Sequence, residues 1–301
     1  MLITNKIAVL TGGTGYIGRH LAAYLWAQGW EVVVIVRAGR RYTKLENYRV
    51  VEYDGTLDSL NTLTLDNESQ VVFFHLAACT EVAQELASVD QIIDSNIRLG
   101  SQLLGYMCEK ELRNIVVAES YWQFNGMGVS SGTTLYSASK SAFSLLLEYF
   151  SRHGIRSTAL VLYDVYGPDD ERGKLINALI KSAVDRTIIK LTPGEQYLDY
   201  VYIDDVVKAF ERAAISLLTS PEKEGSFHRY TVRTMEVRRL KDFVEILGQA
   251  VGQSPLVIWG GKPYPAHQIF QPWFPQASWQ LPEWCPEYTF FSAIRRIVEH
   301  G

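Results

Sequence analysis

The sequence predicts an α/β protein built on a doubly wound parallel sheet, followed by a smaller C-terminal lobe. Apolar, strand-like runs alternate with helical patterns through the first half of the 301-residue chain, which is the order of a parallel sheet with helical crossovers. The first apolar run leads directly into a glycine-rich turn and a helical pattern. The second half differs, because seven of the ten prolines fall between Pro255 and Pro286, and prolines interrupt helices and sheets.

The individual elements can be placed in order along the chain. After a first strand that begins at about residue 6, strands are expected at 31–36, 50–53, 71–76, 114–118 and 155–162. Helices are expected at 19–28, 90–111 and 136–152. A further strand passes into a helix at 199–206, where Asp204 or Asp205 would cap the helix. The segment 255–286 is expected to hold no regular sheet or helix, and a last helix is expected at 291–299.

A glycine motif joins the first strand to its helix. Gly12 provides the sharp turn, Gly15 lets a pyrophosphate approach the backbone, and Gly18 lets the helix pack against the strand. Unpaired N–H groups and the positive end of the helix dipole then face the phosphates. This context predicts a dinucleotide-binding domain of the Rossmann type at 1–165, with a return segment at about 198–220. The smaller lobe, at 166–197 and 221–301, is expected to bind the substrate.

Composition and charge exclude several classes of function. A net charge of −4 offers no basic surface for nucleic acid. The three cysteines, Cys79, Cys108 and Cys285, have no metal-ligand spacing and fit a reducing compartment. No apolar run reaches the roughly 18 residues of a membrane span, and the early first strand leaves no room for a signal peptide. We therefore expect a cytoplasmic protein with no membrane, nucleic-acid or metal partner.

A tyrosine and a lysine lie four residues apart at the start of a predicted helix. On one helix face, the ammonium of Lys140 would lower the pKa of the Tyr136 phenol, which could then exchange a proton with a substrate oxygen near neutral pH. Tyr106 and Lys110 have the same spacing, so spacing alone decides nothing. Tyr106 lies in the middle of a helix before the fifth strand and is expected to be a packing residue.

The position of Tyr136 distinguishes it from Tyr106. Tyr136 follows the fifth strand, at the carboxyl edge of the sheet where ligands bind. Ser120 lies just past the end of that strand and can hydrogen-bond the same substrate oxygen; the alternative is that it is only a turn residue. We predict Ser120, Tyr136 and Lys140 as catalytic residues.

Together these features resemble the extended short-chain dehydrogenase/reductase superfamily, and within it the NAD-dependent epimerase/dehydratase family that acts on nucleotide sugars. The resemblance covers most of the chain and is carried by Thr11 to Gly18, Asp54, His75 to Ala78, Asn96, Ser120, Tyr136 with Lys140, Tyr166 to Pro168, and Asp204 with Asp205. Further segments are similar to a branch that includes reductases of CDP-linked 4-keto-deoxyhexoses, such as CDP-abequose and CDP-paratose synthases. These segments are 121–123, 135–136, 163–168 and 193–196.

The resemblance implies residues for both ligands. Lys140 would hold the nicotinamide ribose hydroxyls, and Asp54 would hydrogen-bond the adenine amine. The other cofactor-binding residues it implies are Gly12, Thr14, Gly15, Tyr16, Ile17, Gly55, Leu76, Ala77, Ala78, Asn96, Tyr136, Tyr163 and Val165. The substrate residues it implies are Trp122, Phe124, Asp164, Lys174 and Leu191. Trp122 and Phe124 would wall the sugar pocket, unless they are core residues.

Departures from the family pattern concern the cofactor first. Many NAD-dependent members have an acidic residue at the end of the second strand, whereas this chain has Val36 and then Arg37, followed by Arg40 and Arg41. Without the carboxylate a 2′-phosphate meets no repulsion, and guanidinium groups can bind it directly. We assign the three arginines to cofactor binding and expect NADP(H) rather than NAD(H). The alternative is a solvated basic loop.

Other departures concern the reaction. Dehydratases of the family carry a Thr-Asp-Glu run after the fifth strand, but no adjacent acid pair follows the hydroxyl in Glu119-Ser120-Tyr121. We therefore do not expect 4,6-dehydration. Many relatives also have an arginine where this chain has Leu198, so diphosphate contacts are expected from elsewhere, such as Lys174 or Arg233.

We expect an NADPH-dependent reduction of the 4-keto group of a nucleotide-linked deoxyhexose, with CDP as the nucleotide that the branch suggests. The alternatives are a 4-epimerase that retains its cofactor, and a non-catalytic NADP-sensing protein, which the catalytic set argues against. The resemblance also implies a homodimer formed through the helices at 90–111 and 136–152. At least one tryptophan of the C-terminal lobe is expected to contact the nucleotide sugar, the alternative being a small core formed by Trp259, Trp273, Trp279 and Trp284.

Overall fold

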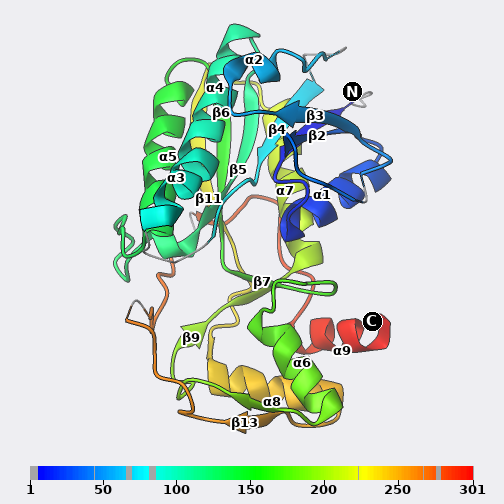
Figure 1. Ribbon diagram of the computed structural model, residues 1–301, viewed down its shortest axis with the longest axis vertical. Helices are drawn as coiled ribbons and strands as arrows, with labels where there is room; N and C mark the ends of the chain where they lie inside the picture. Colours follow the sequence, from blue (N-terminus) through cyan, green and yellow to red (C-terminus); the bar gives the residue numbers. More distant parts are fainter. Residues whose placement is uncertain are drawn as a thin grey trace. The chain divides into compact units, whose positions relative to one another are not determined.

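A seven-stranded sheet is the central feature of the protein (Figure 1), whose computed structural model describes residues 6–43, 45–65, 70–80, 86–222, 224–266, 268–275 and 279–300. The strand order is β11-β6-β5-β4-β1-β2-β3. The strands are β1 Ile7–Thr11, β2 Glu31–Arg37, β3 Arg49–Tyr53, β4 Val71–His75, β5 Asn114–Ser120, β6 Arg156–Leu162 and β11 Ser226–Val232. β1 pairs in parallel with both β2 and β4, so the strand order reverses between β1 and β4. This is the predicted doubly wound sheet, and ligands bind at such a switch point.

Helices cover both faces of the sheet. Figure 1 shows α3, α4 and α5 on one face and α1 and α7 on the other. Their bounds are α1 Tyr16–Ala27, α2 Leu57–Leu60, α3 Leu86–Ile93, the π-helical turn η2 Asp94–Arg98, α4 Leu99–Glu109, the 3₁₀ turn η3 Tyr121–Gln123, α5 Leu135–Ser151 and α7 Ile203–Thr219. The helix expected at 90–111 therefore begins earlier, at Leu86, and contains a π-helical turn.

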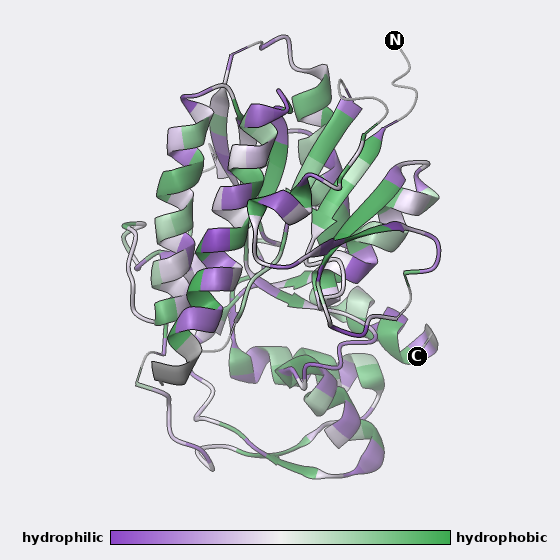
Figure 2. Ribbon diagram, turned by 45° about the horizontal axis from the view of Figure 1, so that its top comes forward, coloured by the Kyte–Doolittle hydropathy of each residue, from purple (hydrophilic) through white to green (hydrophobic). Residues whose placement is uncertain are grey.

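The core lies between the central strands and their helices. Val9, Val33 and Phe73 are fully buried and belong to one hydrophobic cluster with Leu103 of α4 and Phe143 of α5. Figure 2 shows the hydrophobic colour along the central strands. Because helices cover both faces, these strands read as continuous apolar runs, and for this reason their positions could be predicted.

Smaller two-stranded sheets belong to the C-terminal half. β7 Asp164–Tyr166 pairs in parallel with β10 Tyr200–Tyr202, β9 Tyr197–Leu198 pairs antiparallel with β12 Arg238–Arg239, and β8 Ile188–Lys190 pairs in parallel with β13 Leu256–Ile258. The helices here are α6 Leu175–Asp185, α8 Leu240–Val251 and α9 Phe290–His300. Aromatic rings form their core: Phe243 lies 5.0 Å from Tyr200 and 4.7 Å from Phe290, centroid to centroid.

Two expectations about this half were wrong. Strand β13 falls inside the segment 255–286, which was expected to hold no regular structure; Pro255 precedes the strand and leaves its residues free to pair with β8. Asp204 and Asp205 lie inside the first turn of α7 rather than at its cap. The Asp205 carboxylate instead accepts backbone N–H groups from Glu287 and Tyr288, at 2.9 and 3.2 Å.

The chain divides into two compact units. The first unit is Met1–Gln123 with Ser130–Val161 and Val207–Tyr230, and the second is Phe124–Val129 with Leu162–Val206 and Thr231–Gly301. The expected domain boundaries differ from this division, because 124–129, 162–165 and 198–206 belong to the second unit and 221–230 to the first. The pairing of β7 with β10 explains part of the difference, since it ties the end of the predicted first domain to the second unit.

Two absences apply to the described residues. Among them, we find no helix with the length and apolarity that a membrane crossing requires. Within the same described ranges, no group of three or more His, Cys, Asp or Glu side chains is arranged to hold a metal ion.

Candidate active site

The glycine turn between β1 and α1 is built as the sequence predicts. Gly12 has a φ of +74°, and a Cβ there would lie 2.6 Å from the backbone nitrogen of Ala77. A Cβ on Gly18 would lie 2.0 Å from the carbonyl oxygen of Gly12, so only glycine lets the helix approach the strand. Gly15 is the N-cap of α1 and has no side chain to cap it, which leaves first-turn N–H groups for an anion.

A pocket of about 760 Å³ opens beside this turn. Its lining includes ten of the residues predicted to bind the cofactor: Gly12, Thr14, Gly15, Arg37, Arg40, Asp54, Gly55, Leu76, Ala77 and Ala78. A glycine turn without Cβ atoms, an uncapped helix start and a mixed apolar and cationic wall fit a nicotinamide dinucleotide. The pocket lies within the first compact unit.

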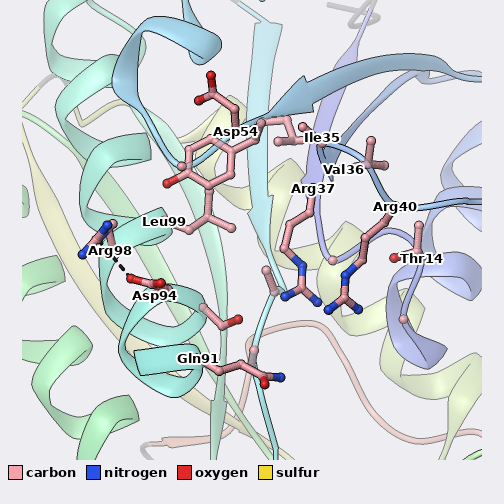
Figure 3. Close-up of a pocket in the computed structure, with 18 of the residues that line it drawn as sticks. Thr14, Ile35, Val36, Arg37, Arg40, Asp54, Gln91, Asp94, Arg98 and Leu99 are labelled. Carbon is pink, nitrogen blue, oxygen red and sulfur yellow. Dashed lines mark ion pairs between the residues drawn. The ribbon is translucent and has the colours of Figure 1, made fainter. Parts of the chain in front are cut away.

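The cationic wall of the pocket comes from the end of β2. In Figure 3 the guanidinium groups of Arg37 and Arg40 point to the same side of the pocket. Asp94 and Arg98 pair with each other at 3.1 Å. The Asp54 carboxylate accepts hydrogen bonds from the backbone N–H and hydroxyl of Thr56, which lower its pKa. The third predicted arginine, Arg41, is exposed and is not part of the lining.

Sequence reasoning missed one wall of the pocket. Asp90, Gln91, Asp94, Ser95, Arg98 and Leu99 line it from α3, η2 and α4, and Ile35, Val36, Ala38 and Tyr53 add to it from β2, β3 and the residue after β2. A usable signal existed: the helix after β4 begins at the carboxyl edge of the sheet, so its first turns face any ligand bound there.

Two predicted cofactor residues at α1, Tyr16 and Ile17, do not line this pocket, and neither does Asn96. The Asn96 amide is instead occupied within the protein. It accepts from the N–H of Cys79 at 2.7 Å, and donates to the Cys79 carbonyl at 3.1 Å and to the Ser139 hydroxyl at 2.9 Å. Asn96 thus ties the chain after β4 to helix α5.

Ser120, Tyr136 and Lys140 come together where β5 meets α5. A capping box starts the helix: the Thr134 hydroxyl accepts from the N–H of Ser137 at 3.1 Å, and the Ser137 hydroxyl accepts from the N–H of Thr134 at 3.0 Å. The helix therefore begins at Leu135, with Tyr136 in its first turn. The Lys140 ammonium donates to the carbonyl of Ala118 at 2.9 Å. Ser120 is the last residue of β5, not a residue beyond it as expected.

The charge state of this set differs from the prediction. Burial raises the pKa of Tyr136 above its usual value, and a hydrogen bond with Ser120 only partly opposes this shift. Burial also lowers the pKa of Lys140 to about 8, against the negative charge of Glu119. The expectation of a lowered Tyr136 pKa was therefore wrong, because burial outweighs the hydrogen bond from Ser120 that lowers it. The phenol is protonated at neutral pH.

Tyr106, the other tyrosine with a lysine four residues later, is a packing residue as predicted. Its ring belongs to the hydrophobic core, and its hydroxyl donates to the carbonyl of Leu63 at 2.8 Å. Lys110 lies on the surface and pairs with Glu109.

The second unit holds most of the residues predicted to bind substrate. Phe124 is buried, with its ring centroid 4.9 Å from that of Trp273. Asp164 lies on β7. Tyr163 and Val165, which were predicted to bind the cofactor, are also in this unit: the Tyr163 hydroxyl donates to the carbonyl of Trp273, and Val165 lies on β7. Lys174 is the exposed N-cap of α6, and Leu191 is buried after β8. Trp122 belongs to the first unit and is half-buried next to Ser120, to whose hydroxyl its N–H donates at 3.3 Å.

All four C-terminal tryptophans have structural partners. Trp284 is buried and donates to the carbonyl of Asp205 at 3.1 Å. Trp259 packs against Gly194, where a Cβ would lie 2.5 Å from its ring. Trp273 and Trp279 are half-buried, with ring centroids 4.8 Å apart. A Cβ on Gly128 would lie 2.5 Å from the Trp273 ring, and the Trp279 carbonyl accepts from the Thr231 hydroxyl at 3.3 Å.

Arg233, one of two residues expected to contact the diphosphate, pairs with a carboxylate of the second unit. Its Nε donates to the Asp199 carboxylate at 3.1 Å, and the side chain is 7% exposed. Its guanidinium also lies over the rings of Phe274 and Tyr163, at 4.3 and 5.4 Å from their centroids.

His75 gives the site a measurable pH response. Burial, with a smaller contribution from the Lys140 charge, lowers its pKa to about 3, and its Nδ1 is 2.8 Å from the Thr11 hydroxyl. Below about pH 6.5, the usual histidine pKa, His75 binds a proton in the unfolded chain but stays neutral in the folded protein. The free energy of unfolding therefore falls as pH falls. We expect a loss of about 2 kcal/mol from this group at about pH 5 relative to neutral pH.

Urea unfolding of His75→Gln between about pH 4.5 and 7.5 measures this contribution. The slope of unfolding free energy against pH is proportional to the number of protons taken up on unfolding. In His75→Gln this number should be smaller than in the wild type by about one at the acid end of the range. The matched control is His153→Gln, which changes an exposed histidine and should leave the slope as in the wild type. An unchanged slope for His75→Gln would contradict the assignment.

The sheet, the glycine turn and the pocket define a Rossmann-type dinucleotide-binding protein. A family model described as the NAD dependent epimerase/dehydratase family matches residues 8–229, more than half of the chain, and the protein belongs to this family. The predicted fold class and family are thereby confirmed.

Particular relatives give a narrower comparison. The chain is 29% identical over 260 residues to the CDP-abequose synthase of Yersinia pseudotuberculosis, covering 84% of this chain and 87% of the relative. It is 25% identical over 308 residues to the CDP-abequose synthase of Salmonella typhimurium, covering 99% of each. Among solved structures, MoeE5 in complex with UDP-glucuronic acid and NAD has a TM-score of 0.80 at 18% identity and 97% coverage of both chains. The UDP-glucose 4-epimerase of Thermus thermophilus in complex with NAD has a TM-score of 0.78 at 21% identity and 98% coverage of both chains.

Proposed function

We propose that the protein is an NADPH-dependent reductase of the 4-keto group of a nucleotide-linked deoxyhexose. The observation that carries the choice of cofactor is the placement of Arg37 and Arg40 in the pocket beside the end of β2. Two guanidinium groups can bind a 2′-phosphate bidentately. NADP(H) carries this phosphate and NAD(H) does not. Binding of NADP(H) favours a reduction, because an epimerase returns its hydride and needs no exchange of cofactor.

The protonation state of Tyr136 supports the reductive direction. A reductase needs a proton donor at the keto oxygen, and the raised pKa of Tyr136 keeps its phenol protonated at neutral pH. The protonated phenol is the form that donates the proton in such a reduction.

The reaction can be written from the roles of the chain's own groups. The Ser120 hydroxyl donates a hydrogen bond to the keto oxygen and stabilises the negative charge that develops there. Bound nicotinamide supplies the hydride that forms the new C–H bond. The Tyr136 phenol gives its proton to the oxygen, so the ketone becomes a secondary alcohol. We assign Lys140, four residues later on the same helix, to stabilising the phenolate left behind.

The nucleotide and sugar are proposed from the relatives. Two of them are named CDP-abequose synthase and cover most or all of the chain. We therefore propose a CDP-linked deoxyhexose as substrate. The half-buried rings of Trp273 and Trp279, with Phe124, would form an apolar wall of its binding site.

A nucleotide-sugar 4-epimerase is the second candidate, since several structural neighbours are 4-epimerases solved with NAD. Stoichiometry separates the two. A reductase should consume one NADPH for each alcohol formed, measured as the loss of the reduced nicotinamide absorbance against product by chromatography. A purified protein that holds non-exchanging NAD and interconverts two sugars without an absorbance change would establish the epimerase instead.

The homodimer and the cytoplasmic location stay predictions. The exposed Leu145 and Tyr149 on α5 are compatible with a subunit contact on that helix, and sedimentation velocity measures the mass directly.

A further inference from the structure

An ion pair with a buried carboxylate lies directly beside the catalytic serine. The carboxylate of Glu119, which precedes Ser120 on β5, is almost fully buried. Arg229 of β11 holds both of its oxygens, with Nε at 2.7 Å from Oε2 and a terminal nitrogen at 3.1 Å from Oε1. A buried charge pair is costly to desolvate, and neither Glu119 nor Arg229 has a part in the reaction proposed above.

The carboxylate also closes a ring of hydrogen bonds. The Ser144 hydroxyl donates to Glu119 Oε1, and the Gln123 amide donates to the Ser144 hydroxyl at 3.1 Å. The other end of the Gln123 amide accepts the backbone N–H of Ser120 at 2.8 Å. Ser120 and Glu119 are adjacent, so the ring returns to its start. All four residues are buried. The Ser144 hydroxyl also lies 3.1 Å from the backbone carbonyl of Lys140, so the ring is joined to the helix turn that carries Lys140.

Three successive residues of β5 thus hold three residues of one face of α5. Ala118 binds Lys140 through its carbonyl, Glu119 binds Ser144, and Ser120 hydrogen-bonds Tyr136. Positions 136, 140 and 144 are four apart and share one face of the helix. Glu119 is the one charged residue of β5. It lies between Ala118, which binds Lys140, and Ser120, which hydrogen-bonds Tyr136.

We propose that Glu119, held by Arg229, is a positioning residue of the active site, which fixes Ser120 through Ser144 and Gln123 and places a negative charge next to the Ala118 carbonyl that binds Lys140. The proposal rests on the catalytic roles of Ser120, Tyr136 and Lys140 in the proposed function. It also accounts for a buried ion pair at this position.

The groups around Lys140 support the electrostatic part. Glu119 on β5 raises the pKa of Lys140, which burial otherwise lowers. The imidazole of His75 on β4 is neutral above a pKa of about 3, and the Tyr136 phenol on the same helix is protonated. On the helices packed against α5, Asp94 is paired with Arg98, and Asp90 lines the cofactor pocket. Without the Glu119 charge, Lys140 would lose the carboxylate that raises its pKa.

The variant Glu119→Gln tests the proposal, because it keeps the shape of the side chain and removes its charge. We expect kcat to fall by about 10²-fold, the effect of misplacing a catalytic group, while KM for NADPH and for the ketosugar stays nearly constant. The alkaline limb of the kcat profile, which reports loss of the Lys140 proton, should move to lower pH. An unchanged kcat and profile would overturn the proposal.

Two further variants separate positioning from plain stability. Glu148→Gln removes the other carboxylate near Arg229, at 4.0 Å, which lies outside the hydrogen-bond ring; kcat and its pH profile should not change. Glu119→Gln/Arg229→Gln also removes the guanidinium that Glu119→Gln deprives of this carboxylate, so the unfolding temperature should recover while kcat and the shifted limb do not. Recovery of kcat in the double variant would mean that Glu119 only stabilises the fold, and would overturn the proposal.

The pKa of Lys140 can be measured without any substrate, so this part of the test does not depend on the proposed reaction. NMR of protein labelled with ¹³C at lysine Cε, with the Lys140 signal assigned through Lys140→Met, gives the titration midpoint of Lys140. It should lie near pH 8 in the wild type, lower in Glu119→Gln, and be unchanged in Glu148→Gln. An equal midpoint in wild type and Glu119→Gln refutes the electrostatic role of Glu119. Failure of the wild type to reduce any nucleotide-linked ketosugar would instead refute the proposed function.

Discussion

Tyr136→Phe is expected to reduce turnover by about 10²–10⁴-fold or more, the contribution of a positioned proton donor. The phenol is the group that protonates the developing alkoxide, and phenylalanine has no proton to give. The ring remains in the first turn of α5, so folding and NADPH binding should be nearly unchanged. Stopped-flow reduction of the ketosugar, together with NADPH titration and thermal unfolding, measures all three quantities.

Tyr106→Phe is the matched control for this experiment. It removes a hydroxyl that donates to the Leu63 carbonyl in the core, so it should lower stability by about 1 kcal/mol and leave kcat unchanged. If Tyr106→Phe were the inactive variant and Tyr136→Phe the active one, the assignment of the catalytic helix would be wrong.

NADPH is expected to bind roughly ten- to a hundredfold more tightly than NADH, a difference of about 1.5–3 kcal/mol. The physical reason is the pair of guanidinium groups, Arg37 and Arg40, that face the pocket at the end of β2. The double variant Arg37→Ala/Arg40→Ala should lose this preference and bind both cofactors with similar affinity. Titration of each reduced cofactor by its fluorescence gives the four dissociation constants.

Arg41→Ala serves as the control for this pair. Arg41 has the same charge and lies next in the chain, but it is outside the pocket lining, so its loss should leave the cofactor preference as in the wild type. Wild-type protein that binds NADH as tightly as NADPH, or more tightly, would show that the arginines form only a solvated basic loop.

Much of the first unit could be predicted from local sequence. The runs at β1, β2 and β4 are continuously apolar because both of their faces are buried. The glycines of the turn recur at fixed positions because the strand and the helix approach each other too closely there for a Cβ. Ten of the predicted cofactor residues line the pocket for a related reason: they lie at or just beyond the carboxyl ends of strands.

Contacts between residues far apart in the chain could not be predicted. Arg229 pairs with Glu119 from 110 positions away, and nothing near either residue indicates a partner. The wall formed by Gln91 and Asp94 depends on how the helix after β4 turns toward the sheet. The exclusion of Arg41 from the pocket depends on the path of a surface loop, which three neighbouring arginines do not reveal.

Local sequence was enough to predict the doubly wound sheet, the dinucleotide turn, the family and the placement of Tyr136 and Lys140 on one helix, because each depends on residues close together in the chain or on a regular period. The charge states of Tyr136 and Lys140 could be assigned only once the chain was folded. The raised pKa of Tyr136 and the lowered pKa of Lys140 follow first from burial, and burial is a property of the whole fold, since it is created by every chain segment that excludes water from the site.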